Sequence, residues 1–154
     1  MGSFIAVFVL VALMAGGAAP PRAERTVGDL RVEMTVAKAA FQPGDPVAVT
    51  MRATNAGSET LALTSGGQQY DVIVRQRGAL VWQWSHDKAF AQVIRTVRLA
   101  PQETLTYKAT WDQRDLQGRL VEPGTYEISC VLMATQRPGS GNIEVGPVRI
   151  TVGR

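Results

Sequence analysis

Apolar residues alternate with polar ones along most of the chain, at a period of two, and this pattern most constrains the fold. It is clearest in residues 65–92, where two such runs are separated by a turn at residues 76–78. Successive side chains of a β-strand point to opposite faces, so each run predicts a strand with one buried face. The residues expected on these buried faces are Tyr70, Val72, Val74, Leu80, Trp82 and Trp84. We expect Trp82 and Trp84 to fill the core beside Leu80, between two sheets, and not to contact a ligand.

Turn signals separate further runs of this kind between residue 30 and the C-terminus. Strands are expected at residues 30–36, 47–53, 61–63, 93–99, 105–111, 126–132 and 148–152. No segment shows a sustained helical period. The pattern predicts an all-β fold, an antiparallel immunoglobulin-like β-sandwich of about 7–9 strands. The sequence Pro-Gly-Thr-Tyr126 is typical of a tyrosine corner, in which the tyrosine hydroxyl bonds to a neighbouring loop.

The N-terminal residues 1–19 are expected to form a secretory signal peptide. Residues 4–14 are an uninterrupted apolar run, followed by small residues at 15–19. A transmembrane helix needs about 20 apolar residues, so no stable membrane insertion is expected after signal removal. This predicts an extracytoplasmic protein; an uncleaved anchor and a mis-assigned start codon, which would leave the protein in the cytoplasm, are the alternatives. Residues 20–29 mix proline, charged and small residues, which predicts a linker before a domain at residues 30–154.

The composition excludes several kinds of site. Cys130 is the only cysteine and His86 the only histidine, so the chain can form neither an intrachain disulfide nor a thiolate or multi-histidine metal centre. The formal net charge is +3, and the basic residues are scattered singly. Nucleic-acid binding needs clustered cations, so no nucleic-acid partner is expected. The aspartates lack the spacing of a calcium loop, and no cofactor is expected.

No group of residues has the arrangement of a catalytic site. Ser85, His86 and Asp87 are the residue types of a hydrolase triad, but they are contiguous, whereas triad members converge from separate elements. A polar turn in which Ser85 or Asp87 bonds main-chain amides explains them better. Cys130 follows Tyr126 and Ile128 in the alternation of apolar residues, which predicts a buried, inert thiol. Gln92 is expected to be a buried amide that bonds a strand edge, and the protein is not expected to be an enzyme.

A series of short motifs extends over roughly residues 30–132. The motifs are Phe41-x-Pro-Gly-Asp-Pro-Val47, Asn55, Gly67-Gln68-x-Tyr70-Asp71, Val81-Trp82-x-Trp84-Ser85, Phe90-x-Gln92, Leu99-x-Pro101, Trp111 and Pro123-Gly124-x-Tyr126. In these motifs and their order the chain resembles the BsuPI family of intracellular proteinase inhibitors. The resemblance implies an immunoglobulin-like sandwich without catalysis, and membership of a family named for inhibiting a bacterial intracellular serine proteinase. The motif residues for which it implies a structural role are Gln68, Tyr70, Asp71, Trp82, Trp84, Ser85, Phe90, Gln92, Trp111 and Tyr126.

The leading interpretation is a non-enzymatic domain that inhibits a serine proteinase by inserting a loop into its cleft. A β-sandwich presents loops at its ends, and two of these are polar, contain glycine and lack core periodicity. Residues 112–123 offer Arg114, Gln117 and Arg119, and residues 137–141 offer Arg137 and Ser140. The alternative is an exported immunoglobulin-like adhesion or assembly module of the bacterial envelope that inhibits nothing. The signal-like segment favours this alternative, because the target in the family's name is intracellular.

Overall fold

The computed structural model describes residues 19–136 and 141–153. None of these residues lies in a helix, which confirms the predicted all-β class, and their eleven strands exceed the predicted number. The strands are β1 (Arg22–Val27), β2 (Leu30–Val36), β3 (Ala40–Phe41), β4 (Val47–Asn55), β5 (Leu61–Ser65), β6 (Tyr70–Gln76), β7 (Ala79–Gln83), β8 (Arg95–Leu99), β9 (Thr104–Trp111), β10 (Gly124–Leu132) and β11 (Ile143–Val152).

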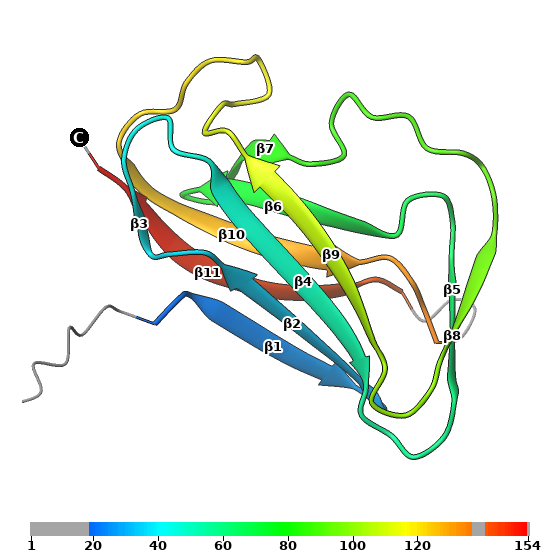
Figure 1. Cartoon of the computed structure of the whole chain (residues 1–154). Coiled ribbons are helices and arrows are strands. Elements are labelled where there is room, and N and C mark those ends of the chain that lie inside the picture. Colours follow the sequence, from blue (N-terminus) through cyan, green and yellow to red (C-terminus); the bar gives the residue numbers. More distant parts are fainter. Residues whose placement is uncertain (1–18, 137–140, 154) are drawn as a thin grey trace, which may run out of the picture.

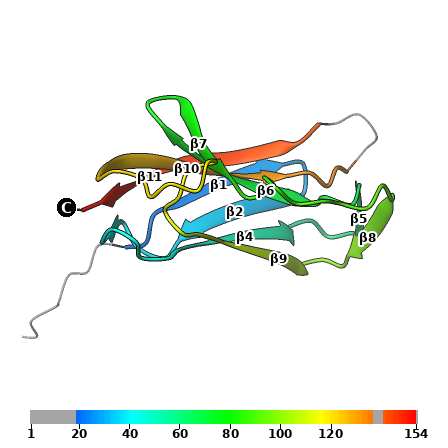
Figure 2. The same cartoon turned by 90° about the horizontal axis from the view of Figure 1, so that it is seen from above.

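The strands form two sheets that pack face to face (Figures 1 and 2). One sheet has the order β1-β2-β4-β9, and the other has the order β3-β11-β10-β6-β7. Strands β5 and β8 pair separately as a ribbon at one end of the sandwich. The pairing is antiparallel except between β3 and β11, which are parallel, so the prediction of a wholly antiparallel sandwich is wrong at this one edge.

Strand β1 corrects the prediction that residues 20–29 are a linker. It pairs with β2 along its full length, from Arg22 opposite Thr35 to Val27 opposite Leu30. Most of its side chains are exposed, and it has no apolar period from which a strand could be predicted. Because β1 is an edge strand, its charged side chains also oppose pairing with a further strand.

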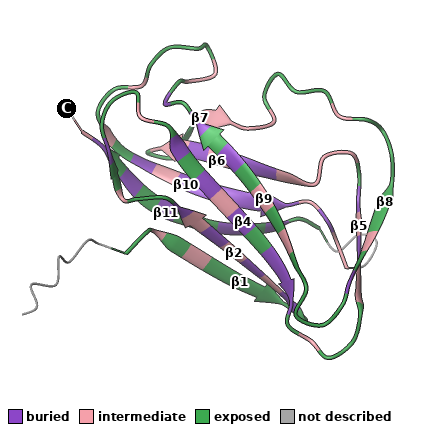
Figure 3. Ribbon diagram, in the orientation of Figure 1, coloured by how far each residue is buried: buried purple, intermediate pink, exposed green. Residues whose placement is uncertain are grey.

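The core consists of the alternating apolar residues of the facing strands, as the sequence predicts (Figure 3). In β2 every second residue is buried, and the same holds for the first seven residues of β4. In β10 the buried residues include Tyr126, Ile128, Cys130 and Leu132. These side chains belong to one apolar cluster between the sheets, and its removal from water is the main stabilising contribution.

A β-bulge in β7 overturns the prediction that Leu80, Trp82 and Trp84 share one buried face. Val81 is an extra residue, inserted where the pairing of β7 with β6 shifts register. An inserted residue reverses the alternation on either side of it. Leu80 is accordingly 47% exposed, and Trp82 and Trp84 pack against the core only in part. Trp111 of β9 is instead the fully buried tryptophan.

The predicted tyrosine corner is present at the start of β10. The hydroxyl of Tyr126 donates a hydrogen bond to the main-chain carbonyl of Glu122, four residues upstream. This bond ties the end of loop 112–123 to the core. Figure 1 shows the loop at the same end of the sandwich as the turn between β6 and β7.

Candidate functional site

Asp71 is the centre of a buried polar network that links β6 to β7. Its fully buried carboxylate accepts five hydrogen bonds. Oδ1 accepts from the main-chain N–H groups of Val72 (2.9 Å) and Ser85 (3.0 Å). Oδ2 accepts from Gln68 Nε2 (3.2 Å), Gln83 Nε2 (2.6 Å) and Ser85 Oγ (2.6 Å). A buried carboxylate needs such partners, so the network accounts for the two motifs that contain Gln68-x-Tyr-Asp71 and Trp-Ser85.

The side chain of Ser85 bonds to a different partner than predicted, and it does not bond to the neighbouring His86 or Asp87. Its hydroxyl donates to Asp71, where the sequence predicts a bond to a main-chain amide. His86 is exposed, and its Nε2 lies 3.2 Å from Asp87 Oδ2. The serine hydroxyl and the imidazole thus have different partners, and the three residues do not form a relay.

Cys130 lies behind this network, on the core side of β10. The thiol is fully buried, as predicted. Burial, and secondarily the charge of Asp71, raises its pKa to about 12. At neutral pH the thiol is therefore protonated and a poor nucleophile.

Aromatic rings join the two sheets beside the Asp71 network. The ring of Tyr70 on β6 stacks on Trp84 (centroids 4.3 Å apart) and also contacts Tyr107 on β9 (4.8 Å). The Tyr70 hydroxyl donates to the main-chain carbonyl of Lys108 (2.8 Å), and Phe90 packs on Trp84 (5.9 Å). Burial is the main cause that raises the pKa of both Tyr70 and Tyr107. The rings pack against one another, which is typical of aromatic residues that connect two sheets and not of a surface that binds a ligand.

Gly67 allows the irregular segment 86–94 to pass close to the start of β6. A Cβ atom at this position would lie 2.0 Å from the main-chain oxygen of Ala91, a distance that no side chain can tolerate. Gln92, the residue after Ala91, is exposed, so the prediction that its side-chain amide is buried is wrong. The main chain of Ala91, and not the side chain of Gln92, makes the close contact.

Loop 112–123 is a small hairpin with extensive internal bonding. Arg114 and Leu120 face each other in an antiparallel bridge, and the N–H of Asp115 donates to the carbonyl of Arg119 (2.8 Å). The Asp115 carboxylate accepts from the N–H groups of Gln117 (2.9 Å) and Arg119 (3.0 Å), and its Oδ2 lies 3.5 Å from Arg119 Nε. These bonds, first of all that from the Arg119 N–H, lower the pKa of Asp115. At neutral pH the carboxylate is therefore ionised and accepts these bonds.

Gln113 anchors the base of this hairpin, although no sequence pattern identified it. Its side chain is fully buried and its φ is 60°, a conformation that residues other than glycine rarely adopt. Its Oε1 accepts from the N–H of Gly44 (3.0 Å), and its Nε2 donates to the carbonyls of Gln42 and Asp45 (2.9 Å each). Its own carbonyl accepts from the N–H of Val121 (2.8 Å). One buried amide thus joins both sides of the hairpin to the turn before β4.

Two buried aromatic residues hold the loop from the core side. The indole N–H of Trp111 donates to the carbonyl of Arg114 (2.8 Å), where the loop begins. Tyr126 holds the carbonyl of Glu122, where the loop ends. Their rings pack edge to face with centroids 5.4 Å apart. Both ends of the loop are therefore attached to a single rigid aromatic pair.

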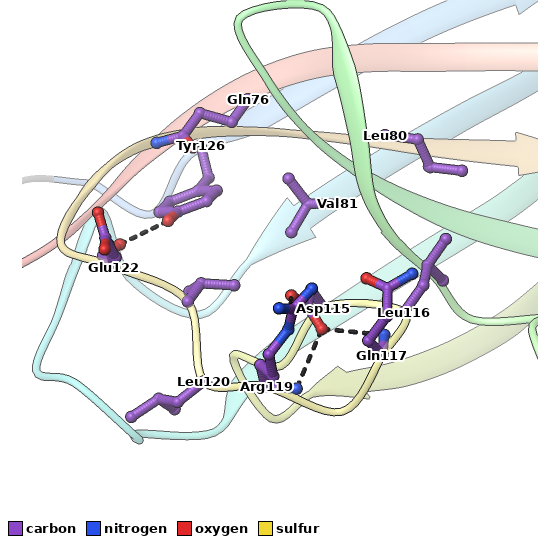
Figure 4. Close-up of a pocket in the computed structure, with 11 residues that line it drawn as sticks. Gln76, Leu80, Val81, Asp115, Leu116, Gln117, Arg119, Leu120, Glu122 and Tyr126 are labelled. Atoms are coloured by element: carbon purple, nitrogen blue, oxygen red, sulfur yellow. Dashed lines mark hydrogen bonds and ion pairs between the residues drawn. The ribbon is translucent and has the colours of Figure 1, made fainter.

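A hollow of about 490 Å³ separates this loop from β7 (Figure 4). The apolar residues that line it are Leu80, Val81, Leu116, Leu120, Val121 and Tyr126. The N–H of Leu116 donates to the carbonyl of Val81 (3.1 Å), which ties the loop to the edge strand. Leu80 and Leu120 are 47% and 49% exposed, on opposite sides of the hollow. The other residues that line it are polar or charged: Gln76, Asp115, Gln117, Arg119 and Glu122.

The three predicted loop residues within 112–123 have different surroundings. The Arg114 guanidinium donates to the carbonyl of Gly118 (2.9 Å), and Arg119 pairs with Asp115, so both arginines contribute to the loop's own structure. The side chain of Gln117 is exposed at the tip. The side chains of Arg114 and Arg119 are nevertheless 52% and 76% exposed, so all three predicted residues remain accessible to a partner.

The second predicted pair, Arg137 and Ser140, lies outside the described residues. Gln136, which precedes them, donates from its Nε2 to the carbonyl of Val27 (2.7 Å), at the end of β1. Strand β10 runs from loop 112–123 toward Gln136, so Gln136 and that loop lie at opposite ends of the sandwich.

Two further searches concern residues 19–136 and 141–153 alone. Among them, no three His, Cys, Asp or Glu residues are grouped so that they could hold a metal ion. No helix long and apolar enough to cross a membrane occurs in the same part of the chain.

Comparison with solved structures shows that similar folds occur in proteins of distant sequence. Spo0M, the sporulation control protein of Bacillus subtilis, aligns with a TM-score of 0.51 at 15% identity, over 83% of this chain and 51% of Spo0M. The chain therefore spans about half the length of that protein. The C-terminal domain of wzt aligns with a TM-score of 0.50 at 8% identity, over 90% of this chain and 81% of that one. The CARDB domain of PF1109 from Pyrococcus furiosus aligns at 17% identity with a TM-score of 0.47, over 87% and 94% of the two chains.

Comparison by sequence gives the family. No curated protein matches significantly. The family described as BsuPI, intracellular proteinase inhibitor, matches residues 34–137, which are more than half of the chain. The match runs from β2 to beyond β10 and includes both the Asp71 network and loop 112–123. This chain therefore belongs to the BsuPI family of intracellular proteinase inhibitors.

Proposed function

We propose that this protein is a non-enzymatic inhibitor that binds a serine proteinase through loop 112–123. The observation that carries the proposal is the exposed hairpin whose tip, base and two ends are each fixed by hydrogen bonds. Asp115 holds the tip, Gln113 holds the base, and Trp111 and Tyr126 hold the ends. Family membership supports the inhibitory activity, and the geometry supports this loop as the binding element.

Rigidity matters because binding costs the entropy of every segment that it orders. A loop that is already fixed loses little conformational freedom in a proteinase cleft, so more of the contact energy appears as affinity. Inhibitor complexes bury about 800 Å² on each partner. The exposed side of the hairpin, residues 114–121, forms the surface proposed for such a contact.

The proposed partner is an extracytoplasmic serine proteinase. The apolar run at residues 4–14 followed by small residues is typical of a secretory signal, and an exported inhibitor meets proteinases of the envelope or the medium.

Inhibition assays with a panel of serine proteinases, including subtilisin, chymotrypsin and trypsin, test the proposal. The wild type is expected to inhibit at least one enzyme at micromolar concentration or below. A variant with residues 115–119 replaced by glycine and serine is expected to lose this inhibition. The matched control is Val93→Ser with Ile94→Ser, which removes exposed apolar side chains (41% and 85% exposed) from the other long loop and should inhibit as the wild type does. No inhibition across the panel by a wild type that is folded, as judged by circular dichroism, would reject the proposal.

The alternative, an adhesion or assembly module of the envelope, predicts a different partner. A pull-down from envelope extract with the wild type and the 115–119 variant separates the two functions. A proteinase that is retained by the wild type alone supports the inhibitor. A structural protein that both variants retain supports the assembly module.

A further inference from the structure

We infer that Leu120 is the residue of loop 112–123 that enters the primary specificity pocket of the proteinase, so the target is an enzyme whose pocket accepts a large apolar side chain. The inference rests on the proposed function and adds to it the residue that selects the enzyme. Three observations distinguish Leu120 from its neighbours on the loop: the direction of its main-chain groups, the exposure of its side chain and the way its flanks are held.

The bridge between Arg114 and Leu120 determines where the main-chain groups of Leu120 point. Hydrogen bonds lie on both sides of this pair, from Asp115 to Arg119 and from Val121 to Gln113. In an antiparallel ladder such a pair is a non-hydrogen-bonded one, and its own N–H and C=O groups face away from the partner strand. Within the described residues, neither group of Leu120 has a hydrogen-bond partner. Both are therefore free to pair with an extended segment of another protein.

The side chain of Leu120 is also available. It is 49% exposed, although a leucine gains free energy by burial. Figure 4 shows it across the hollow from Leu80 and Val81 and directed away from them. A proteinase pocket lined with apolar groups would remove this surface from water, which is the contribution that makes a single anchor residue dominate an interface.

On either side of Leu120, main-chain groups are already hydrogen-bonded within the protein, which distinguishes these positions from Leu120. Arg119 uses its N–H and its carbonyl inside the hairpin, and its guanidinium pairs with Asp115. On the other side, Val121 donates its N–H to Gln113, and the carbonyl of Glu122 accepts from Tyr126. Leu120 is thus a single exposed position with free main-chain groups between two anchored ones. The Arg119 side chain is 76% exposed and would suit a trypsin-like pocket, but the N–H and C=O groups of Arg119 are both used inside the hairpin and so are not available to pair with a proteinase.

The test exchanges the anchor for a cation and measures which enzyme is inhibited. Inhibition constants of the wild type, Leu120→Lys and Leu80→Lys are measured with subtilisin, chymotrypsin and trypsin. Leu80 is the matched control because it is equally exposed and lines the same hollow but belongs to β7. Urea midpoints of the three proteins check that each is folded.

The wild type is expected to inhibit subtilisin or chymotrypsin and not trypsin. Leu120→Lys should weaken that inhibition by at least about 30-fold, the loss expected for an anchor residue, and should gain inhibition of trypsin. Leu80→Lys should remain within about threefold of the wild type. Inhibition of subtilisin that is unchanged in Leu120→Lys, or a wild type that inhibits only trypsin, would overturn the assignment of Leu120 while leaving the proposed function intact. Equal losses in the two lysine variants would overturn it as well, and a wild type without any inhibition would reject both the assignment and the proposed function.

Discussion

Two aspartates of this protein accept main-chain hydrogen bonds in the same way but in opposite surroundings. Asp71 is fully buried and has five donors from β6, β7 and the residues next to them. Asp115 is at the surface, where it accepts the N–H groups of Gln117 and Arg119 and pairs with the Arg119 side chain. The first arrangement joins β6 to β7 and the residues next to them within one sheet, whereas the second shapes one loop without contributing to the core.

This difference separates what belongs to the fold from what can select a partner. The family motifs include Asp71, Gln68 and Ser85, and these residues are directed at one another. The tip of loop 112–123 contributes no motif residue, and its side chains are more exposed than those of the Asp71 network. We therefore expect changes in the Asp71 network to alter stability and changes in the loop to alter binding.

Asp71→Ala tests the first half of that expectation and should have the largest effect. It leaves five donors without their acceptor in a buried site, and the expected cost is about 3–5 kcal/mol of unfolding free energy. Urea unfolding measures it, with Glu59→Ala, the loss of an exposed carboxylate, as a control that should stay within about 0.5 kcal/mol. A loss below about 1 kcal/mol for Asp71→Ala would mean that the network is not structural.

Trp111→Ala and Trp84→Ala compare how much the tryptophan beneath loop 112–123 and the tryptophan beside the Asp71 network each contribute to stability. Trp111 lies fully buried beneath the loop, so its removal should cost about 3–5 kcal/mol. Trp84, beside the Asp71 network, is only partly buried, and about half of that cost is expected for it. Urea melts of both variants decide the order. A larger loss of unfolding free energy for Trp84→Ala would show that the partly buried Trp84, and not Trp111 beneath the loop, contributes more to stability.

Ser85→Ala is expected to have an intermediate effect within the Asp71 network. Its hydroxyl donates to a buried charge at 2.6 Å, and a hydrogen bond to a charged group is worth about 1.5–3 kcal/mol. Ser58→Ala, an exposed serine in the turn after β4, is the matched control. The proposed role of Ser85 is contradicted if the two variants unfold at the same urea concentration.

The acid titration of Asp115 should have the smallest effect and sharpen the contrast with Asp71. Its pKa is lowered from an ordinary value of 3.8, so its contribution to the loop is complete above that pH and is lost as the pH falls through the lower folded-state value. The amide proton resonances of Gln117 and Arg119 should therefore shift in one titration step whose midpoint lies below pH 3.8. In Asp115→Asn this step should be absent. A step above pH 3.8 in the wild type would show that the carboxylate does not hold the loop tip.

The sequence predicts the regular parts of this fold well because burial on one face imposes a period of two. Val47, Val49 and Met51 in β4 are examples. Strand β1 escapes prediction because its exposed residues carry no period, and Leu80 is misplaced because the bulge at Val81 reverses the alternation.

Side chains that bond across the sequence are the part of the site that could not be predicted. Asp71 occupies an outward position of β6 yet is buried, because Gln68, Gln83 and Ser85 cover it. Gln113 follows no pattern at all. The one signal for it is the Pro-Gly turn at residues 43–44, whose main-chain groups require a partner from elsewhere.

Hydrogen exchange with and without bound subtilisin tests the central claim most directly, since it locates the contact on the folded protein. The account predicts slower exchange in the complex for amides of residues 114–121, above all that of Leu120, and unchanged exchange for residues 68–85. Slower exchange concentrated in residues 86–94 or in the Asp71 network, with none in the hairpin, would contradict it.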